Sequence, residues 1–368
     1  MRVAGDIAYL LPVGGIEIVT LEDTTALAAR GHEVDLFFGL DGDQRRFFED
    51  GGVRLHGPVG FKLTRRRPLK DLLGFLPALR QVRRLRPDVI WLSRAEHVVW
   101  GRLLAAAAGV RLVTHLHHAP SSPRTRWLTK GVSRFIAVSH FTRQQWIDAG
   151  VPGDRIDVIH NALPPGRYPF GGAEEMRVAR RALGLPESGR VITFYGRFTD
   201  DKGLPTVLEA FSRIGRDDVV LLLAGFYPPE LDSSETRRRM AAIPEDRLRV
   251  VAPSSDVVPF LHAADVVATP SWVAEAFGRT IVEGMSTGRP VIGARVGAVP
   301  ELLEGGMERL LVPSRDAGAL LAAMLDVLDW RDTEPDLGAA CRAWVEERFP
   351  YDEHLARVEA VLQANARG

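Results

Sequence analysis

Two glutamates, Glu275 and Glu283, frame a segment whose residue types suit a phosphorylated ligand. Between them, an irregular stretch is predicted to turn into a helix at Phe277-Gly278-Arg279-Thr280. A helix that begins after a glycine presents free backbone N–H groups and the positive end of its dipole, and both attract phosphate oxygens. A glutamate one turn further along can accept two hydrogen bonds from ribose hydroxyls. The segment therefore predicts part of a nucleotide-sugar site, with Glu275 near the group that the phosphate carries.

Two cations follow a predicted strand in the second half of the chain. Arg197 and Lys202 lie between that strand and the next helix, so both can point towards the strand end. There they would stabilise a diphosphate, and more so a diphosphate that gains charge as it leaves. Only four of the 47 basic residues are lysines, so a retained lysine suggests a position where guanidinium does not fit. Two exposed loop cations beside Asp200 and Asp201 are the alternative interpretation.

The first half of the chain carries two further candidates. Gly14-Gly15 opens a helix after the first strand, and paired glycines let a backbone approach a ligand closely. An ordinary tight turn is the alternative, and the pattern is not a dinucleotide-binding fingerprint. His115, His117 and His118 end another strand. No cysteine lies near them, so we expect no metal site; a neutral histidine that bonds a sugar hydroxyl fits better.

The composition is that of a globular protein without a strongly charged partner. At 368 residues the chain is long enough for two domains, and its formal net charge of zero argues against nucleic acid as a partner. We find no apolar run of about 18 residues and no signal peptide, so we expect a cytoplasmic protein. The single Cys341 excludes an internal disulfide and fits a reducing compartment.

Short β-branched runs alternate with amphipathic helical segments, which predicts βαβ units and parallel sheets. The predicted strands cover residues 34–38, 89–92, 112–117, 135–139, 158–160, 191–196, 219–225, 248–251, 266–270, 291–294 and 310–312. Residues 164–172 are rich in proline and glycine, which indicates a linker. We expect an α/β fold with two Rossmann-like, doubly wound domains, residues 1–163 and 173–348, and a ligand cleft at the strand C-termini.

Residues 62–86 contain nine basic residues and one acid, Asp71, and Leu69, Leu72, Leu73, Leu76 and Leu79 run through the stretch. Such a segment could make weak peripheral contact with an anionic membrane or grip an anionic acceptor. Pro68, Gly74 and Pro77 interrupt it, so we do not expect one clean amphipathic helix. A solvated surface segment is the simpler interpretation.

These motifs occur in the order found in retaining glycosyltransferases of family 4, and the whole chain resembles that family. The resemblance rests on Gly14-Gly15, His117, residues 196–203, and Glu275 with Glu283. It extends to Arg30-Gly31-His32-Glu33-Val34, Pro87-Asp88-Val89 and Gly288-Arg289-Pro290-Val291-Ile292. It implies the GT-B fold, in which a last helix, residues 351–366, would cross back onto the first domain.

The resemblance also implies a role for each matching residue. Arg197 and Lys202 would hold the donor diphosphate and the leaving nucleotide, while Glu283 would bind the ribose hydroxyls. Glu275 would lie by the transferred sugar, and so would His117, whose choice over its two neighbouring histidines rests on strand register. The other donor-binding positions would be Gly14, Gly15, Gly196, Gly225, Phe277, Gly278, Arg279 and Thr280.

The implied reaction moves a sugar from a nucleotide-diphosphate sugar to an acceptor hydroxyl. A UDP-sugar such as UDP-GlcNAc or UDP-glucose would be the donor, and a bacterial natural product or cell-envelope saccharide would be the acceptor. Front-face displacement would retain the anomeric configuration, with no metal, no cofactor and no side-chain nucleophile.

Three departures from the family pattern leave the identity of the donor open. Residues 226–229 stand where a second glycine often follows Gly225, Ala162 follows Asn161 in place of a common glycine, and Ala276 follows Glu275. Two alternative hypotheses are a sugar-nucleotide 2-epimerase of related fold and a catalytically silent nucleotide-sugar-binding protein. The acid and base carboxylates typical of the first are not recognisable, and the intact cations argue against the second.

Overall fold

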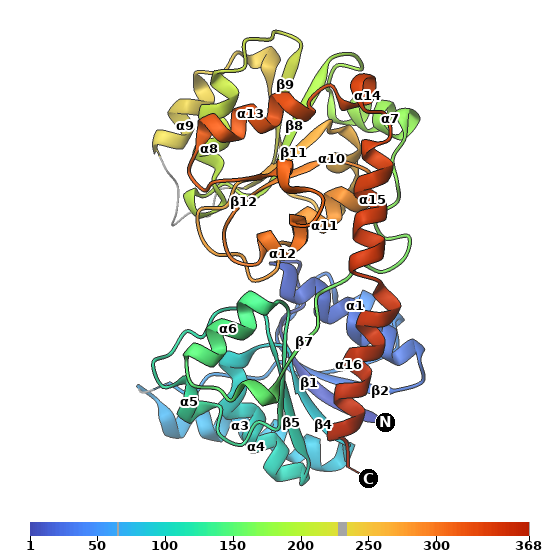
Figure 1. The fold of residues 1–368 in the computed structure, drawn as a ribbon. Coiled ribbons are helices and arrows are strands. Elements are labelled where there is room, and N and C mark those ends of the chain that lie inside the picture. The colour runs from blue at the N-terminus through green and yellow to red at the C-terminus, as the bar shows by residue number, and fades with distance from the viewer. Residues whose placement is uncertain (65, 227–233, 368) are drawn as a thin grey trace. The chain divides into compact units, whose positions relative to one another are not determined.

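The computed structural model describes residues 1–64, 66–226 and 234–367 (Figure 1). Contacts divide the chain into two compact units. Unit 1 comprises Met1–Asn161 and Tyr351–Gly368, and unit 2 comprises Ala162–Pro350. Each unit has its own parallel sheet with helices on both faces, so the predicted α/β fold class with two parallel sheets is confirmed.

Unit 1 is built on a seven-stranded parallel sheet in the order β3-β2-β1-β4-β5-β6-β7. Its strands are β1 (Arg2–Tyr9), β2 (Glu33–Leu40), β3 (Val53–His56), β4 (Val89–Leu92), β5 (Arg111–Leu116), β6 (Arg134–Ala137) and β7 (Ile156–Val158). The strand predictions in this half are confirmed to within two or three residues at each end. Strand β3 was not predicted, because it is a four-residue edge strand in which arginine and histidine alternate with apolar residues.

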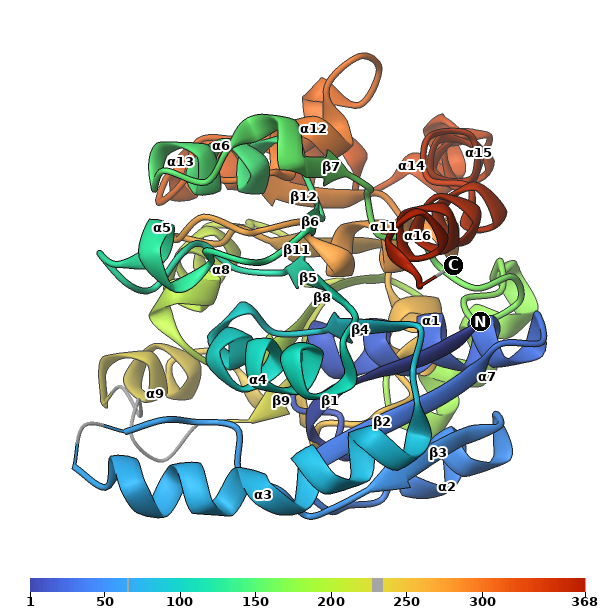
Figure 2. The same ribbon diagram turned by 90° about the horizontal axis from the view of Figure 1, so that it is seen from below.

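The helices of unit 1 cover both faces of the sheet. They are α1 (Gly15–Ala29), α2 (Arg45–Asp50), α3 (Pro68–Leu85), α4 (Val98–Ala108), α5 (Thr125–Leu128), α6 (His140–Asp148) and α16 (Tyr351–Asn365). Successive strand residues point to opposite faces, so Ala4 packs with α3 and α4, whereas Val3 packs with α1 and α16. Figure 2 shows α3 and α4 on one side of this sheet and α16 on the other. The C-terminal helix therefore completes the core of unit 1.

One continuous helix, α3, replaces the interrupted segment that the sequence predicts, so that expectation was wrong. Pro68 occupies the first turn, where its missing N–H costs nothing. Pro77 lies in the middle of the helix, where its missing bond would go to the carbonyl of Leu73, on the exposed side. The helix buries Phe75 and Val82. Among the residues that the structure describes, no helix has the length and apolar character needed to span a membrane.

Unit 2 is built on a six-stranded parallel sheet in the order β10-β9-β8-β11-β12-β13. Its strands are β8 (Arg190–Arg197), β9 (Val219–Phe226), β10 (Leu248–Val251), β11 (Val266–Thr269), β12 (Val291–Ala294) and β13 (Leu311–Val312). All six were predicted to within one residue at each end. They are easier to recognise than those of unit 1 because most are apolar throughout, as strands buried on both faces must be.

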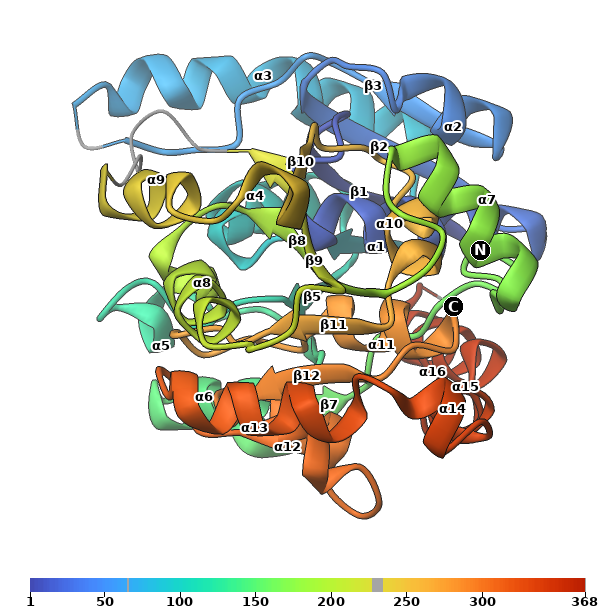
Figure 3. The same ribbon diagram turned by 90° about the horizontal axis from the view of Figure 1, so that it is seen from above.

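The helices of unit 2 also form two layers. They are α7 (Ala173–Leu183), α8 (Leu204–Ser212), α9 (Ser234–Ala241), α10 (Val258–Ala263), α11 (Arg279–Ser286), α12 (Val299–Leu303), α13 (Ala317–Val327), α14 (Trp330–Thr333) and α15 (Leu337–Arg348). Figure 3 shows α7, α10 and α11 on one side of the sheet and α8, α9 and α13 on the other. This arrangement directs the loops that follow β8, β9 and β11 to one edge of the sheet.

The segment predicted as a linker, residues 164–172, packs within unit 2. Tyr168 is buried, and the guanidinium of Arg289 bonds the carbonyl oxygens of Gly171 and His262 at 2.8 and 2.9 Å. Burial, together with the nearby Arg331, lowers the pKa of Arg289 to about 10. The arginine of the predicted motif Gly288-Arg289-Pro290 thus ties this segment to the end of α11.

Candidate functional site

Most of the predicted ligand-binding residues lie at the C-terminal edge of the unit 2 sheet. Arg197 ends β8, and Lys202 lies in the short 3-10 helix η3 (Asp200–Lys202) that follows it. Gly225 lies near the end of β9, and Glu275 lies between β11 and α11. In parallel sheets this edge is where ligands bind, because the loops after each strand converge there.

Lys202 and Glu275 form an ion pair, with Lys202 Nζ 2.7 Å from Glu275 Oε1. Ser271 Oγ donates a second hydrogen bond to the same oxygen at 2.6 Å. Both charged side chains remain partly exposed, at 30% and 23%. Sequence reasoning gave these two residues separate ligand partners. The structure instead couples them, so that Glu275 holds the ammonium group in place while leaving part of it open.

Helix α11 begins directly after Gly278, as the sequence predicts. Gly278 adopts a left-handed conformation (φ 101°, ψ 49°) that a side chain would strain, and no side chain caps the helix. The start of α11 therefore presents backbone N–H groups that no side chain caps, together with the positive end of the helix dipole. Phe277 is buried and packs edge-on against Phe349, so only its backbone can face a ligand.

Glu283 lies one turn into α11 and already accepts hydrogen bonds from Tyr168, Arg279 and Tyr195. Its Oε1 receives the hydroxyl of Tyr168 at 2.8 Å and Nε of Arg279 at 2.7 Å, and its Oε2 receives the hydroxyl of Tyr195 at 2.6 Å. Burial raises the pKa of Tyr195 well above 10, and the adjacent Glu283 charge raises it further, so the phenol stays a donor. A ribose hydroxyl that bonds Glu283 would have to share the carboxylate with these donors or displace one of them.

Arg197 is the most exposed of the candidate cations, with a side chain 45% exposed and 3.2 Å from Asp201. This ion pair agrees with the alternative interpretation, a cation beside Asp201, as far as the immediate partner is concerned. Gly196 pairs with Gly225 across β8 and β9, and a Cβ on Gly225 would lie 1.8 Å from the carbonyl oxygen of Gly196. Gly225 is thus required by packing. Residues 227–229, where the family pattern changes, lie outside the described residues.

In unit 1, the start of α1 carries the predicted glycine pair. Gly14 is the N-cap of α1 in extended backbone, and a Cβ there would meet only ordinary contact with Glu17. Neither its conformation nor crowding requires glycine at this position. Glu17 is buried and forms an ion pair with Arg94, which follows β4 and lies over the ring of Tyr9.

The three clustered histidines differ sharply in environment. His115 lies within β5 and is fully buried, His117 follows the strand and is 9% exposed, and His118 is exposed. The rings of His115 and His117 lie 4.2 Å apart. Burial lowers the pKa of His115 to about 4 and that of His117 well below 6.5, with the neighbouring histidine lowering it further. His117 is therefore a neutral imidazole at the C-terminal edge of the unit 1 sheet.

Sequence reasoning missed four residues that organise these sites. They are Tyr168, Tyr195, Ser271 and Arg94. Two of them had a local signal, since Tyr195 stands directly before the recognised glycine and Ser271 stands four residues before Glu275. Tyr168 is separated from Glu283 by 115 positions in the sequence, so no spacing rule could have joined them.

Comparison with known proteins matches both halves of the chain to glycosyltransferases. The profile of Glycosyltransferase Family 4 matches residues 13–167, and that of Glycosyl transferases group 1 matches residues 189–329. The D-inositol 3-phosphate glycosyltransferase of Corynebacterium efficiens is 30% identical over 193 residues, which are 50% of this chain and 45% of that protein. This chain therefore matches less than half the length of that relative.

Two further proteins are similar over nearly their whole length. The N-acetyl-alpha-D-glucosaminyl L-malate synthase of Bacillus anthracis is 24% identical over 368 residues, covering 95% of this chain and 93% of that protein. The crystal structure of the Anabaena protein Alr3699/HepE in complex with UDP and glucose matches with a TM-score of 0.86 at 21% identity. That match covers 99% of this chain and 100% of the other, and it supports the GT-B fold.

Proposed function

The chain belongs to glycosyltransferase family 4, and from this premise we propose that it transfers a sugar from a UDP-sugar to an acceptor hydroxyl with retention of configuration. UDP-GlcNAc and UDP-glucose are the proposed donors. A bacterial natural product or cell-envelope saccharide is the proposed acceptor. The observation that carries the proposal is the Lys202–Glu275 ion pair on the segment that leads into the uncapped start of α11.

Positive charge at this edge suits a leaving diphosphate. Lys202 is held at 2.7 Å by Glu275 but stays 30% exposed, so a phosphate can approach the ammonium group without a large rearrangement. The backbone N–H groups at the start of α11, which no side chain caps, offer further donors, and Arg197 adds a second cation. Because these groups are fixed before the donor binds, they stabilise the charge that develops on the leaving group.

Glu283 is the proposed ribose ligand. Its Oε2 accepts the hydroxyl of Tyr195, and a carboxylate oxygen has two lone pairs, so a ribose hydroxyl can share this oxygen with the tyrosine. A second bond to Oε1 would displace Tyr168 or Arg279. The proposal therefore includes a local exchange of donors at Glu283 when the nucleotide binds.

The proposed chemical step needs no side-chain nucleophile. The acceptor oxygen forms a bond to the anomeric carbon on the face from which the diphosphate departs, and the bond from that carbon to the phosphate oxygen breaks. The acceptor proton passes to the departing phosphate. In unit 1, Gly15 and neutral His117 are proposed as ligand contacts, since an uncharged imidazole can bond a sugar hydroxyl. We propose that neither metal nor cofactor is required.

A screen by thermal shift and product analysis tests the proposal. A ligand that binds only the native state stabilises it. Since UDP is the nucleotide of the proposed donor, UDP should raise the melting temperature more than ADP or GDP. A UDP-sugar with acceptor should give UDP and a glycoside of unchanged anomeric configuration by NMR, with equal rates in EDTA. Epimerised UDP-sugar formed without acceptor would favour the 2-epimerase, and binding without turnover would favour a silent binding protein.

We also propose weak peripheral membrane contact through α3. Leu69 and Leu73 are 77% and 65% exposed, and Leu72 and Leu76 are exposed on the same face of the helix. Basic residues flank this stripe, as in helices that lie on anionic lipid. Leu69→Ser/Leu73→Ser should reduce flotation with phosphatidylglycerol vesicles, whereas Val178→Ser/Val250→Ser, which removes exposed apolar residues elsewhere, should not. Equal flotation of both variants would contradict the proposal.

A further inference from the structure

We propose that unit 1 carries a second ligand site, a cationic pocket beside α5 that binds a small phosphate ester with an apolar body. The pocket has a volume of about 780 Å³. Residues 123–130, which include α5, form one wall, and residues 150–155 between α6 and β7 form the other. Phe135 and Val151, both at most 2% exposed, form an apolar floor. Its size lies in the range of small-molecule sites.

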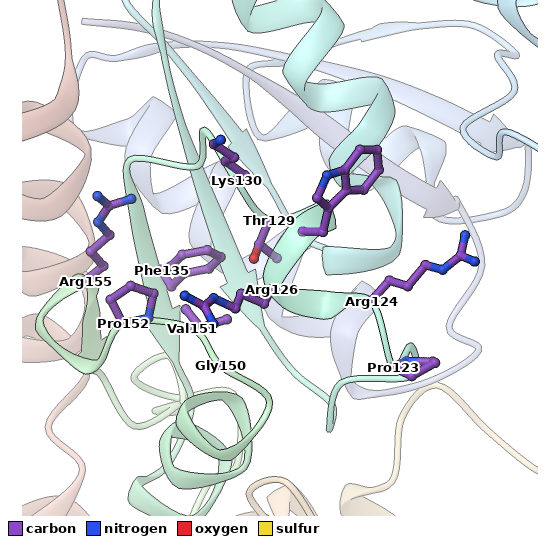
Figure 4. A pocket seen from close by; sticks show the side chains of 11 residues that line it. Pro123, Arg124, Arg126, Thr129, Lys130, Phe135, Gly150, Val151, Pro152 and Arg155 are labelled. Atoms are coloured by element: carbon purple, nitrogen blue, oxygen red, sulfur yellow. The ribbon is translucent and has the colours of Figure 1, made fainter.

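Four cations surround this floor without a counter-charge. They are Arg124, Arg126, Lys130 and Arg155, and none of the eleven residues lining the pocket is acidic. Figure 4 shows Arg126, Lys130 and Arg155 on the side of Phe135 and Pro152, with Arg124 on the opposite side. Within residues 1–64, 66–226 and 234–367, none of these four side chains takes part in an ion pair or a hydrogen bond.

Arg134, close to the pocket in the sequence, differs from these four cations because it has a counter-charge. Arg134, at the start of β6, bonds both carboxylate oxygens of Asp157 at 2.6 and 2.7 Å. The chain as a whole has a formal net charge of zero, so a group of four unpaired cations is a local imbalance. Like charges around a pocket repel one another and concentrate anions there. A bound anion would supply the missing counter-charge.

The pocket is distinct from the candidate donor residues of unit 1. It lies where the chain enters β6 and β7, as Phe135 and Arg155 show. Gly15 and His117 lie where the chain leaves β1 and β5. In a parallel sheet these are opposite edges. The inference therefore goes beyond the proposed transfer reaction and does not depend on it.

The lining specifies the chemical class of the ligand. Inorganic phosphate alone would leave the apolar floor uncovered, whereas a neutral lipid or sugar would leave the cations without a partner. Trp127 lines the pocket and is 70% exposed, and an indole in that position offers a large apolar surface to a ring or alkyl chain. A phosphate ester with an apolar portion satisfies both demands, whether it is a soluble metabolite or a lipid headgroup.

Calorimetric titration with octyl phosphate below its micellar concentration tests the site. We expect one molecule to bind per chain, and Arg126→Ala/Lys130→Ala to weaken binding about tenfold or more, since hydrogen bonds to charged groups are lost. Arg46→Ala/Arg80→Ala, which removes two exposed cations elsewhere in unit 1, should bind as the wild type does. Trp127→Ser should weaken binding a few-fold, and circular dichroism and melting curves establish that each variant is folded.

Two control ligands separate the parts of octyl phosphate. Inorganic phosphate carries the charge without the alkyl chain, and octyl glucoside carries the alkyl chain without the charge. No binding of octyl phosphate, unchanged binding by Arg126→Ala/Lys130→Ala, or equally tight binding of octyl glucoside would overturn the proposal. Phosphatidylglycerol vesicles distinguish the sources in a Leu69→Ser/Leu73→Ser background, where α3 contributes little. Co-sedimentation that depends on Arg126 and Lys130 supports a lipid headgroup as the ligand, whereas binding of octyl phosphate alone supports a soluble ester.

Discussion

At the strand C-termini of unit 2 the acids are paired in advance, whereas the same edge of unit 1 holds neutral histidines. Glu275 is bound by Lys202 and Ser271, and Glu283 by two tyrosines and Arg279. In unit 1, burial removes the charge of His115 and His117. The acids and their cations in unit 2 have charge available to act on a ligand, whereas the histidines of unit 1 offer hydrogen bonds without charge. We infer that charge stabilisation belongs to unit 2 and sugar recognition to unit 1.

The largest effect should come from removing the ammonium group of unit 2. Lys202→Ala is expected to lower turnover about 10²–10³-fold, by comparison with the loss of an oxyanion-hole donor. Folding should change little, because Lys202 is partly exposed. Steady-state kinetics and a denaturant melt measure the two quantities, with Lys70→Ala on the surface of α3 as the matched control. Normal turnover by Lys202→Ala would remove this residue from the site.

The carboxylate of Glu283 provides a second test of the same edge. Glu283→Gln should weaken UDP binding about 10–100-fold, because a bond to a charged acceptor is lost. Tyr168→Phe is the informative control, since it removes one donor from Glu283 and keeps the charge. We expect its UDP affinity, measured by calorimetry, to be no weaker than that of the wild type. A large loss in Tyr168→Phe would mean that the tyrosine itself binds the nucleotide.

Substitutions at the C-terminal edge of the unit 1 sheet should lower transfer activity less than those in unit 2. His117→Ala is expected to lower transfer about two- to tenfold, because one hydrogen bond to a neutral hydroxyl is lost. Its pKa lies well below 6.5, so the imidazole of the wild type should show no titration by NMR between pH 6.5 and 8. A titration in that window, or a loss of activity as large as that of Lys202→Ala, would mean that His117 acts as a charged group. The difference between the two units would then be contradicted.

The smallest effect concerns a buried histidine of unit 1 that does carry charge. His354 on α16 bonds Asp23 on α1 at 2.9 Å and the carbonyl of His160 at 2.7 Å. Burial alone would lower the pKa of His354, but Asp23 and the carbonyl raise it overall above 6.5. The stabilisation is therefore complete below pH 6.5 and is lost as the pH rises through the raised pKa.

Hydrogen exchange of the α16 amides, corrected for intrinsic rates, measures this loss. Protection of α16 should fall between pH 6.5 and 9 in the wild type, and His354→Gln should show a flatter profile. The pKa of His115 is about 4 and that of His117 is lower than 6.5, so neither contributes in this window. An identical pH dependence in His354→Gln would assign the effect to another group.

The sequence predicted the sheets better than it predicted the contacts within the site. Buried strands such as β12 are apolar throughout and stand out, whereas β3, with alternating polar residues at a sheet edge, does not. Helix α11 and its glycine N-cap follow from local chemistry. The pairing of Lys202 with Glu275 spans 73 positions, so only the convergence of two strand ends could have indicated it. The continuity of α3 through Pro77 depends on an exposed carbonyl that no pattern reveals.

The most direct test of the central claim is hydrogen exchange of the whole protein with and without UDP. The account predicts that the largest gain in protection lies at the end of β8 and in the loop after it, residues 197–203, and in the segment that leads into α11 with its first turn, residues 275–283. Glu283→Gln should lose that gain at matched UDP concentration. Protection that is absent from both segments, or that is unchanged in Glu283→Gln, would contradict the assignment of the donor site to unit 2.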